Sequence, residues 1–326
     1  MSFSILGTGS ALPSRTVTNE ELSQIVDTSD EWIRTRTGSS ERRVCSNESI
    51  SDLAYQAARN ALADCSCSAK ELDLIICATM SADYTTPSLA CILQMKLGAS
   101  CAAFDVNAAC TGFIYALDVA AGYFARKPDM KILVVAAEAM SRLVDWQDRA
   151  TCVLFGDGAG AAVLGKGDDL LAIQTGAKGN ITSLYAENGW GNSPFRSMQT
   201  QPSAEPAETG YLQMDGQEVF RFAVTSMVQT VEQVLDEAGL TKEDIAWLIP
   251  HQANIRILDS AISRLKLPKE KCLTNIAVRG NTSAACVAIL LDEASREGKL
   301  KKNDLLAFTA FGGGLTTGAC ILRWSR

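Results

Sequence analysis

The sequence of 326 residues contains a single histidine, His251, and only eight prolines, which do not gather into a linker. Any chemistry that pairs a cysteine with an imidazole must therefore use His251. No run of 18 uncharged apolar residues occurs, and the first residues, MSFSILGTGSALPS, lack a basic segment followed by a long apolar one. We therefore expect neither a membrane span nor an export signal.

Charge and composition narrow the classes of protein further. The net charge of −7 argues against nonspecific binding to nucleic acid, so no such partner is expected. The chain is 47% hydrophobic and 21% charged, with a mean hydropathy of +0.06, which is typical of globular proteins. Its length suits two fused halves of about 160 residues better than one core.

Cysteine is plentiful, but its distribution does not resemble a disulfide framework. Eleven cysteines, an odd number, are spread along the chain, and most lie in apolar strings. Free thiols pack in such places as small hydrophobic groups, so a reducing cytoplasm is expected. Cys65 and Cys67 form the one tight pair, with no second pair and no neighbouring histidine, so we expect no metal site.

The pattern of apolar residues predicts the same order of elements twice. Strands are expected at residues 72–80, 102–107, 131–138 and 159–165, and again at 245–252, 272–276, 304–311 and 318–324. Helices are expected at residues 51–64, 110–125, 217–238, 254–265 and 281–295, with a further helical stretch before residue 102. The strands are nearly continuous apolar runs that alternate with helices. This indicates α/β sheets covered on both faces.

The spacing of the elements favours an internal duplication. The paired strands that open at Asp73 and Asp244 lie 171 residues apart, as do the paired helices that open at Cys110 and Asn281. We therefore predict two similar halves, residues 1–167 and 168–326. The two helices are apolar on nearly every side, which predicts that they are buried together between the sheets.

Position selects Cys110 as the candidate nucleophile. The first turn of a buried helix offers unpaired N–H groups and the positive end of the helix dipole. A thiol at that turn is expected to have a lowered pKa, because both features favour the thiolate. The residue type alone would not separate Cys110 from the other ten cysteines.

The other candidates also have ordinary explanations when each is taken alone. His251 ends an apolar strand, where catalytic groups often lie, but a histidine there can simply hydrogen-bond to backbone. Asn281 follows Gly280 and is typical of a turn and helix cap. The glycines at 312–314 permit the close backbone approach of an oxyanion hole or merely form a tight turn. They do not match a phosphate or dinucleotide loop.

Five motifs resemble those of β-ketoacyl-ACP synthase III. They occur in the order of that family and span nearly the whole chain: residues 28–38 (TSDEWIRTRTG) with 41–43 (ERR), 105–110 (DVNAAC), 251–257 (HQANIRI), 280–285 (GNTSAA) and 311–314 (FGGG). The resemblance implies a thiolase-like fold. In that fold, two similar halves form a duplicated αβαβα layered sandwich around two buried central helices.

The resemblance also implies a mechanism. Cys110 would take the acyl group of an acyl-CoA primer, and the backbone N–H groups of Cys110 and Gly313 would form the oxyanion hole. Malonyl-ACP would then lose CO2 while His251 and Asn281 donate hydrogen bonds to its thioester carbonyl. The products would be 3-oxoacyl-ACP, CoA and CO2, which starts fatty acid biosynthesis. No cofactor is implied, since the CoA thioester is a substrate.

Binding residues carry over from the same resemblance. CoA would be bound by Thr28, Trp32, Arg36, Arg149, Gly216, Phe220 and Asn254. The acyl pocket would involve Thr86 and Phe311, and the acyl carrier protein would dock on Arg221, Arg256 and Arg264. The family also implies a homodimer. Solvated surface charge is the alternative explanation for each arginine.

Three positions depart from the family's pattern. Arg279 stands where a tyrosine is usual, and Thr111 follows the nucleophile where a smaller residue is usual. Thr86 stands where many members have a phenylalanine that reaches into the partner's acyl pocket. The smaller side chain predicts room for primers that are longer or more branched than acetyl.

Three other functions remain open on the sequence. The nearest is a condensing enzyme of secondary metabolism with a different primer or acceptor. A cysteine hydrolase such as a thioesterase is a second, although Asn281 stands where an activating carboxylate would be needed. A non-catalytic partner subunit is a third, although such chains typically lose the nucleophile.

Overall fold

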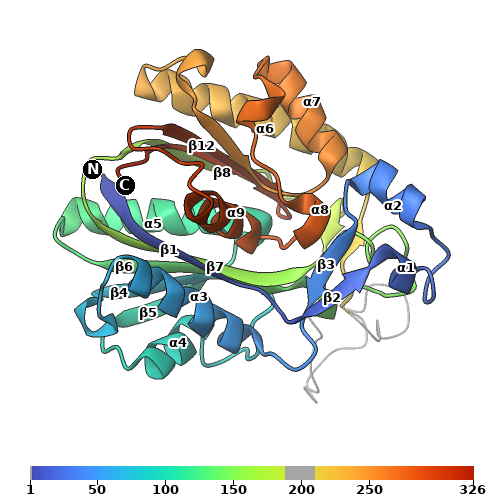
Figure 1. Ribbon diagram of the computed structural model, residues 1–326, viewed down its shortest axis with the longest axis horizontal. Helices are drawn as coiled ribbons and strands as arrows, with labels where there is room; N and C mark the ends of the chain where they lie inside the picture. Colours follow the sequence, from blue (N-terminus) through green and yellow to red (C-terminus); the bar gives the residue numbers. More distant parts are fainter. Residues whose placement is uncertain (1, 188–209) are drawn as a thin grey trace, which may run out of the picture.

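Two β-sheets form the framework of the protein, and the computed structural model describes residues 2–187 and 210–326 (Figure 1). The first sheet has the order β1 (Phe3–Ala11), β7 (Asp157–Lys166), β6 (Ile132–Ala139), β4 (Leu74–Ala78) and β5 (Ala102–Val106). The second has the order β8 (Leu170–Ala177), β13 (Thr316–Arg323), β12 (Leu305–Gly312) and β11 (Trp247–Pro250).

The two sheets repeat one topology. In the first, β1–β7 and β7–β6 are antiparallel, whereas β6–β4 and β4–β5 are parallel. In the second, β8–β13 and β13–β12 are antiparallel and β12–β11 is parallel, and a single parallel bridge joins Leu248 to Cys272 in the place that corresponds to β5. The chain passes from one sheet to the other between Lys166 and Leu170.

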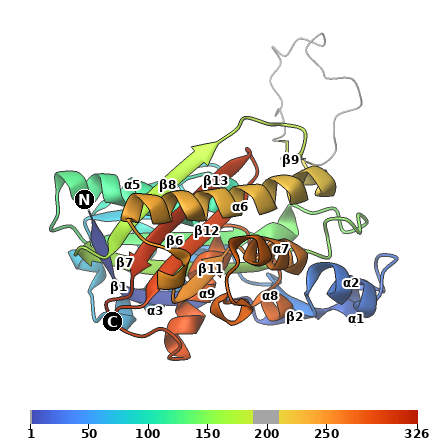
Figure 2. The ribbon, with the colours of Figure 1, turned by 90° about the horizontal axis from the view of Figure 1, so that it is seen from above.

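Helices complete five layers. Helices α5 (Gly112–Arg126) and α9 (Ala285–Arg296) lie between the sheets (Figure 1). Helices α3 (Ile50–Asp64) and α4 (Leu89–Leu97) cover the outer face of the first sheet. Helices α6 (Gly216–Ala238) and α7 (Ile255–Leu265) cover the outer face of the second, as Figure 2 shows from above. The architecture is the thiolase-like αβαβα sandwich.

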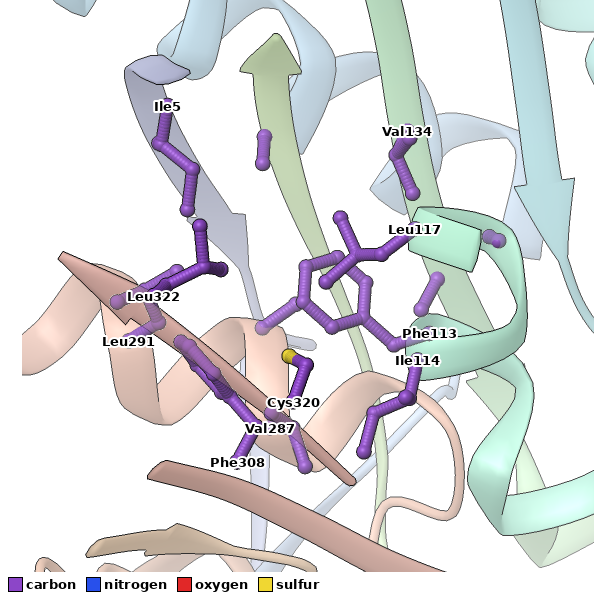
Figure 3. Packing of buried hydrophobic residues seen from close by; sticks show 14 of the residues in the cluster. Ile5, Phe113, Ile114, Leu117, Val134, Val287, Leu291, Phe308, Cys320 and Leu322 are labelled. Atoms are coloured by element: carbon purple, nitrogen blue, oxygen red, sulfur yellow. The ribbon is translucent and has the colours of Figure 1, made fainter. Parts of the chain in front are cut away.

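The central layer explains why the strands are apolar on both sides. Leu74 and Ile76 of β4 face the buried helices, whereas Ile75 and Cys77 face α3 and α4. Between the sheets, side chains of both central helices meet those of both sheets (Figure 3). A helix enclosed in this way must be apolar around its whole circumference.

Short elements lie at one end of the sandwich, near the amino-terminal ends of the central helices (Figure 1). They are β2 (Arg15–Thr18), α1 (Asn19–Leu22), α2 (Asp30–Thr37), β3 (Glu41–Val44), β9 (Leu184–Tyr185), β10 (Gln213–Met214) and α8 (Ile276–Arg279). Strands β2 and β3 pair with each other, as do β9 and β10.

Several element predictions were wrong in detail. Residues 272–276 do not form a strand, because only Cys272 bridges to the sheet and α8 begins at Ile276. The central helices begin later than predicted, at Gly112 and Ala285. Strands β1 and β8 were not predicted, although each closes one edge of a sheet.

Candidate active site

Cys110 lies on a single 3-10 turn between β5 and α5. The turn spans Ala109–Thr111, and Ala109 adopts a positive φ of 47°. The buried Thr111 hydroxyl donates to the Ala108 carbonyl at 2.5 Å and lies 2.8 Å from the Thr316 hydroxyl, which itself lies 3.1 Å from the same carbonyl. This network ties the nucleophile turn to β13.

The glycine turn after β12 approaches Cys110 closely. A Cβ atom at Gly312 would lie 2.7 Å from the backbone nitrogen of Cys110, which is too close for any side chain. Gly313 follows and lines the same cavity as Cys110. Glycine is therefore required at 312 for the two backbones to come together.

Burial changes the ionisation that was expected at Cys110. The residue is 7% exposed, and burial raises the pKa of its thiol to about 12, although the Ser283 hydroxyl donates to the sulfur at 3.4 Å and acts in the opposite direction. The lowered pKa predicted from the helix end was wrong. The apolar surroundings penalise the thiolate more than the helix end favours it.

His251 directly follows β11 and is held in a neutral state. Its N–H donates to the Thr309 carbonyl at 2.8 Å, and its ring meets the edge of Phe311 with 5.3 Å between centroids. Burial lowers the pKa of His251 to about 3, so the imidazole is uncharged at neutral pH. A neutral imidazole donates a hydrogen bond from only one of its two nitrogens.

Asn281 is oriented by its own backbone neighbours. Its N–H donates to the Leu154 carbonyl at 2.9 Å, and Gly280 before it has a positive φ of 64°. Its Oδ1 accepts the N–H of Ser283 at 2.9 Å, which leaves the side-chain NH2 as the group that can donate to a ligand.

One cavity joins these three side chains. It has a volume of about 270 Å³ and is lined by Cys110, His251, Asn281 and Phe311. Toward its mouth it is lined by Trp32, Arg36, Gly216, Phe220, Asn254 and Arg256. A second cavity of about 680 Å³ also reaches Cys110 and is lined by apolar residues that include Met80, Met140 and Phe155. The thiol therefore lies where the two cavities meet.

The aromatic ring at the mouth is enclosed by two cations. The guanidinium carbons of Arg36 and Arg149 each lie 4.8 Å from the centroid of the Trp32 ring. Arg149 also donates to the carbonyl of Asp27 at 2.8 Å. A base stacked between Trp32 and Arg149 would need this guanidinium to move away from the indole.

Other predicted residues lie outside the cavity. Arg149 and Thr28 do not line it, and the Thr28 hydroxyl is buried with no hydrogen-bond partner among the described residues. Arg221 and Arg264 are exposed on α6 and α7. Thr86 is exposed on the loop after β4 and lines neither cavity that reaches Cys110.

Comparison with known proteins gives consistent matches. The model for 3-oxoacyl-[acyl-carrier-protein] synthase III matches residues 104–179, and the model for its C-terminal part matches residues 235–324. A β-ketoacyl-[acyl-carrier-protein] synthase III of Syntrophomonas wolfei is 48% identical, over 100% of this chain and 98% of the relative. The crystal structure of the Aquifex aeolicus 3-oxoacyl-[acyl-carrier-protein] synthase III is 46% identical, with a TM-score of 0.91 over 99% and 100% of the two chains.

The chain belongs to the 3-oxoacyl-ACP synthase III family. It is a condensing enzyme of the acyltransferase type. A priming β-ketosynthase of a polyketide pathway has the same fold, with a TM-score of 0.91 over 99% of this chain and 96% of its own, but it is only 36% identical. The higher identities favour the fatty acid enzymes over that alternative.

Two departures from the synthase III pattern have structural partners. Arg279 Nε donates to Glu293 Oε1 at 2.8 Å, and this ion pair links α8 to α9. Thr111 is fully buried in the hydroxyl network beneath the nucleophile turn. Both residues therefore hold the chain that surrounds the site.

Three residues at the site were not predicted. Ser283 contacts Cys110, Cys286 lies 2.9 Å from His251, and Glu138 is a fully buried carboxyl beneath the nucleophile. Each lies in a stretch that resembles ordinary core in the sequence, and no local signal distinguishes it. Only its partners across the fold do so.

Two further observations concern the described part of this synthase III chain. Within residues 2–187 and 210–326, no group of three His, Cys, Asp or Glu side chains is placed to hold a metal ion. None of the helices described there is long and apolar enough to cross a membrane.

Proposed function

We propose that the protein condenses an acyl-CoA primer with malonyl-ACP to give 3-oxoacyl-ACP, CoA and CO2, the reaction that starts fatty acid biosynthesis. One observation carries the proposal: Cys110, His251 and Asn281 line one cavity, although 141 residues separate the thiol from the imidazole. The cavity leads from a cationic, aromatic mouth to a buried thiol. That arrangement suits a phosphorylated carrier that delivers an acyl group.

In the first half-reaction, the sulfur of Cys110 attacks the thioester carbonyl and CoA leaves as the thiol, so the proton of Cys110 is transferred to the departing sulfur. The carbonyl oxygen becomes an oxyanion, which the N–H groups of Cys110 and Gly313 bind. The close approach of Gly312 to Cys110 supports this pairing. One such donor typically contributes about 3 kcal/mol to the barrier.

In the second half-reaction, malonyl-ACP loses CO2 and its α-carbon attacks the acyl group on Cys110. The free thiol is regenerated after it takes up one proton. The enolate oxygen that develops during decarboxylation needs two donors, which His251 and Asn281 supply. The neutral state of His251 and the orientation of the Asn281 amide support these roles. Neither group carries a negative charge that would repel the enolate.

CoA binds at the mouth of the cavity. Trp32 and Arg149 enclose its adenine, and Thr28 and Arg36 face its nucleotide and phosphates. Gly216, Phe220 and Asn254 border the pantetheine arm, as their position along the cavity supports. The carrier protein docks on Arg221, Arg256 and Arg264, whose exposure supports contact with an acidic partner despite the net negative charge.

The active protein is a homodimer in the cytoplasm. Strand β5 ends its sheet, so its outer edge has no partner strand among the described residues. The exposed Tyr84 and Met95 lie in the neighbouring loop and helix and support an apolar contact there. Thr86 on the same loop would then reach the partner's acyl pocket, while Phe311 lines the protomer's own. All eleven cysteines are free thiols, which supports a reducing compartment.

The decisive experiment offers the purified protein malonyl-ACP with acetyl-, isobutyryl- or octanoyl-CoA, and identifies the products by mass spectrometry. We expect 3-oxoacyl-ACP and an equal amount of CO2, with activity on the larger primers. Cys110→Ala should lose condensation and retain slow decarboxylation. Release of free fatty acid without CO2 would instead indicate a hydrolase, and preference for malonyl-CoA would contradict the proposed acceptor.

A further inference from the structure

A second cysteine touches the imidazole on the side opposite to the chemistry. Cys286 is the second residue of α9 and is 1% exposed. Its Sγ lies 2.9 Å from Nδ1 of His251 and 3.3 Å from the backbone nitrogen of Gln252. The contact occupies one ring nitrogen of His251. The other, Nε2, remains for the cavity that the residue lines.

The directions of these two hydrogen bonds follow from the available protons. The N–H of Gln252 can only donate, so the sulfur accepts there. Burial keeps the thiol protonated by raising the pKa of Cys286, and it keeps the imidazole neutral by lowering the pKa of His251. One S–H and one ring proton therefore remain to be placed. If the S–H donates to Nδ1, both contacts of the sulfur are satisfied and the ring proton is on Nε2.

The opposite arrangement satisfies fewer groups. If Nδ1 carried the proton, the sulfur would receive two N–H donors and its own S–H would need another acceptor. Thiol sulfur is a weak acceptor, and buried polar groups without partners are costly. The edge-on contact with Phe311 also holds the plane of the ring, so Nε2 cannot exchange places with Nδ1 without repacking.

We propose that Cys286 is a positioning residue that fixes the Nε2–H tautomer of His251 by donating its S–H to Nδ1. The imidazole is thereby set to donate, rather than accept, a hydrogen bond on the side of the cavity. The benefit for decarboxylation rests on the proposed function, because only an N–H can stabilise the enolate oxygen. The tautomer itself does not depend on which substrate binds.

The chain offers a direct test, because it contains one histidine. Protein labelled with nitrogen-15 histidine gives the ring nitrogens of His251 alone, and their chemical shifts report which one is protonated. We expect the Nε2–H form at pH 7 in the wild type and in Cys286→Ser, which keeps a donor. Cys286→Ala should gain the Nδ1–H form. A wild-type spectrum of the Nδ1–H form or of an imidazolium would overturn the proposal, as would an unchanged tautomer in Cys286→Ala.

A kinetic test separates positioning from a general packing defect. In Cys286→Ala, the kcat for CO2 release from malonyl-ACP should fall at least tenfold with little change in KM, while acylation of Cys110 by acyl-CoA stays within about twofold. Cys286→Ser should restore most of the rate. Cys320→Ala is the matched control, since Cys320 is also fully buried but lies on β13 in the central core. Equal losses in both half-reactions, or the same loss in Cys320→Ala, would contradict a positioning role.

Discussion

Cys110 and His251 are both buried, and burial moves their pKa values in opposite directions. It raises that of the thiol to about 12 and lowers that of the imidazole to about 3. Both groups are therefore neutral when no substrate is bound. An uncharged pair keeps the site free of an ion pair that a neutral acyl chain would have to displace.

The raised pKa of Cys110 predicts how its reactivity depends on pH. Because the thiolate is the reactive form, its fraction should rise about tenfold for each pH unit below the pKa. We expect the rate of alkylation of Cys110 by iodoacetamide to increase steadily from pH 7 to pH 10. Mass spectrometry of the peptide that contains residue 110 measures it, and Cys110→Ala shows whether other sites contribute. A rate that levels off below pH 8 would contradict the prediction.

Gly312 provides a test of the oxyanion hole. In Gly312→Ala, the added Cβ would lie 2.7 Å from the backbone nitrogen of Cys110, so the two chains must separate. We expect kcat/KM to fall by roughly 100-fold or more, as for the loss of an oxyanion donor. Steady-state assays with acyl-CoA and malonyl-ACP measure this.

Gly122→Ala is the matched control for that substitution. Gly122 lies in α5, and a Cβ there meets nothing within 4 Å. Activity should be unchanged, and the helix should gain up to about 1 kcal/mol of stability. Wild-type kcat/KM in Gly312→Ala would show that backbone contact at this turn does not matter for catalysis.

At the scale of elements, a buried carboxyl joins β6 to the segment that follows β4. Glu138 lies on β6 and is fully buried, with its Oε2 accepting the Ser81 hydroxyl at 2.5 Å and the Met80 N–H at 3.2 Å. Its Oε1 has no partner among the described residues. The loop that leaves β4 is thus held against β6 directly beneath the nucleophile turn.

Burial raises the pKa of Glu138 to about 7 from an ordinary value of 4.5. The folded protein therefore binds this proton more tightly than the unfolded chain does. The resulting stabilisation is complete below pH 4.5 and is lost as the pH rises through 7. Relative to Glu138→Gln, which cannot ionise, the wild type should lose up to about 3 kcal/mol over this range. Urea unfolding at pH 4.5, 6 and 8 measures the difference, and parallel curves for the two proteins would refute it.

At the scale of the whole molecule, the open edge of β5 predicts how two protomers associate. Ala102 is exposed on β5. In Ala102→Glu, the new carboxylates would meet their symmetry mates across a twofold contact and repel each other. We expect a shift from dimer to monomer in light scattering after size-exclusion chromatography.

Gln233→Glu is the matched control for this substitution, because it adds the same charge at an exposed position of α6. That variant should remain a dimer. A dimer that survives Ala102→Glu unchanged would place the interface elsewhere on the molecule.

The duplicated sandwich could be predicted largely from the sequence, because buried strands and helices leave periodic apolar patterns. Most helices and strands were found, and the equal spacing of Cys110 and Asn281 corresponds to two sheets with one strand order. The edge strands β1 and β8 were missed. Each is rich in glycine, alanine or polar residues, so its pairing depends on a strand far along the chain and not on local composition.

The sequence by itself determined which residue types occur where: one imidazole, a cysteine and an asparagine near the starts of two apolar helices, and glycines after a strand. Tertiary structure alone decided what each side chain meets. It raised the pKa of a thiol that the helix end was expected to lower, and it brought Cys286 to a histidine 35 residues away. The physical reason is that apolar patterns record which face of an element is buried. They do not record which atoms lie across from it, and desolvation and hydrogen bonding depend on those atoms.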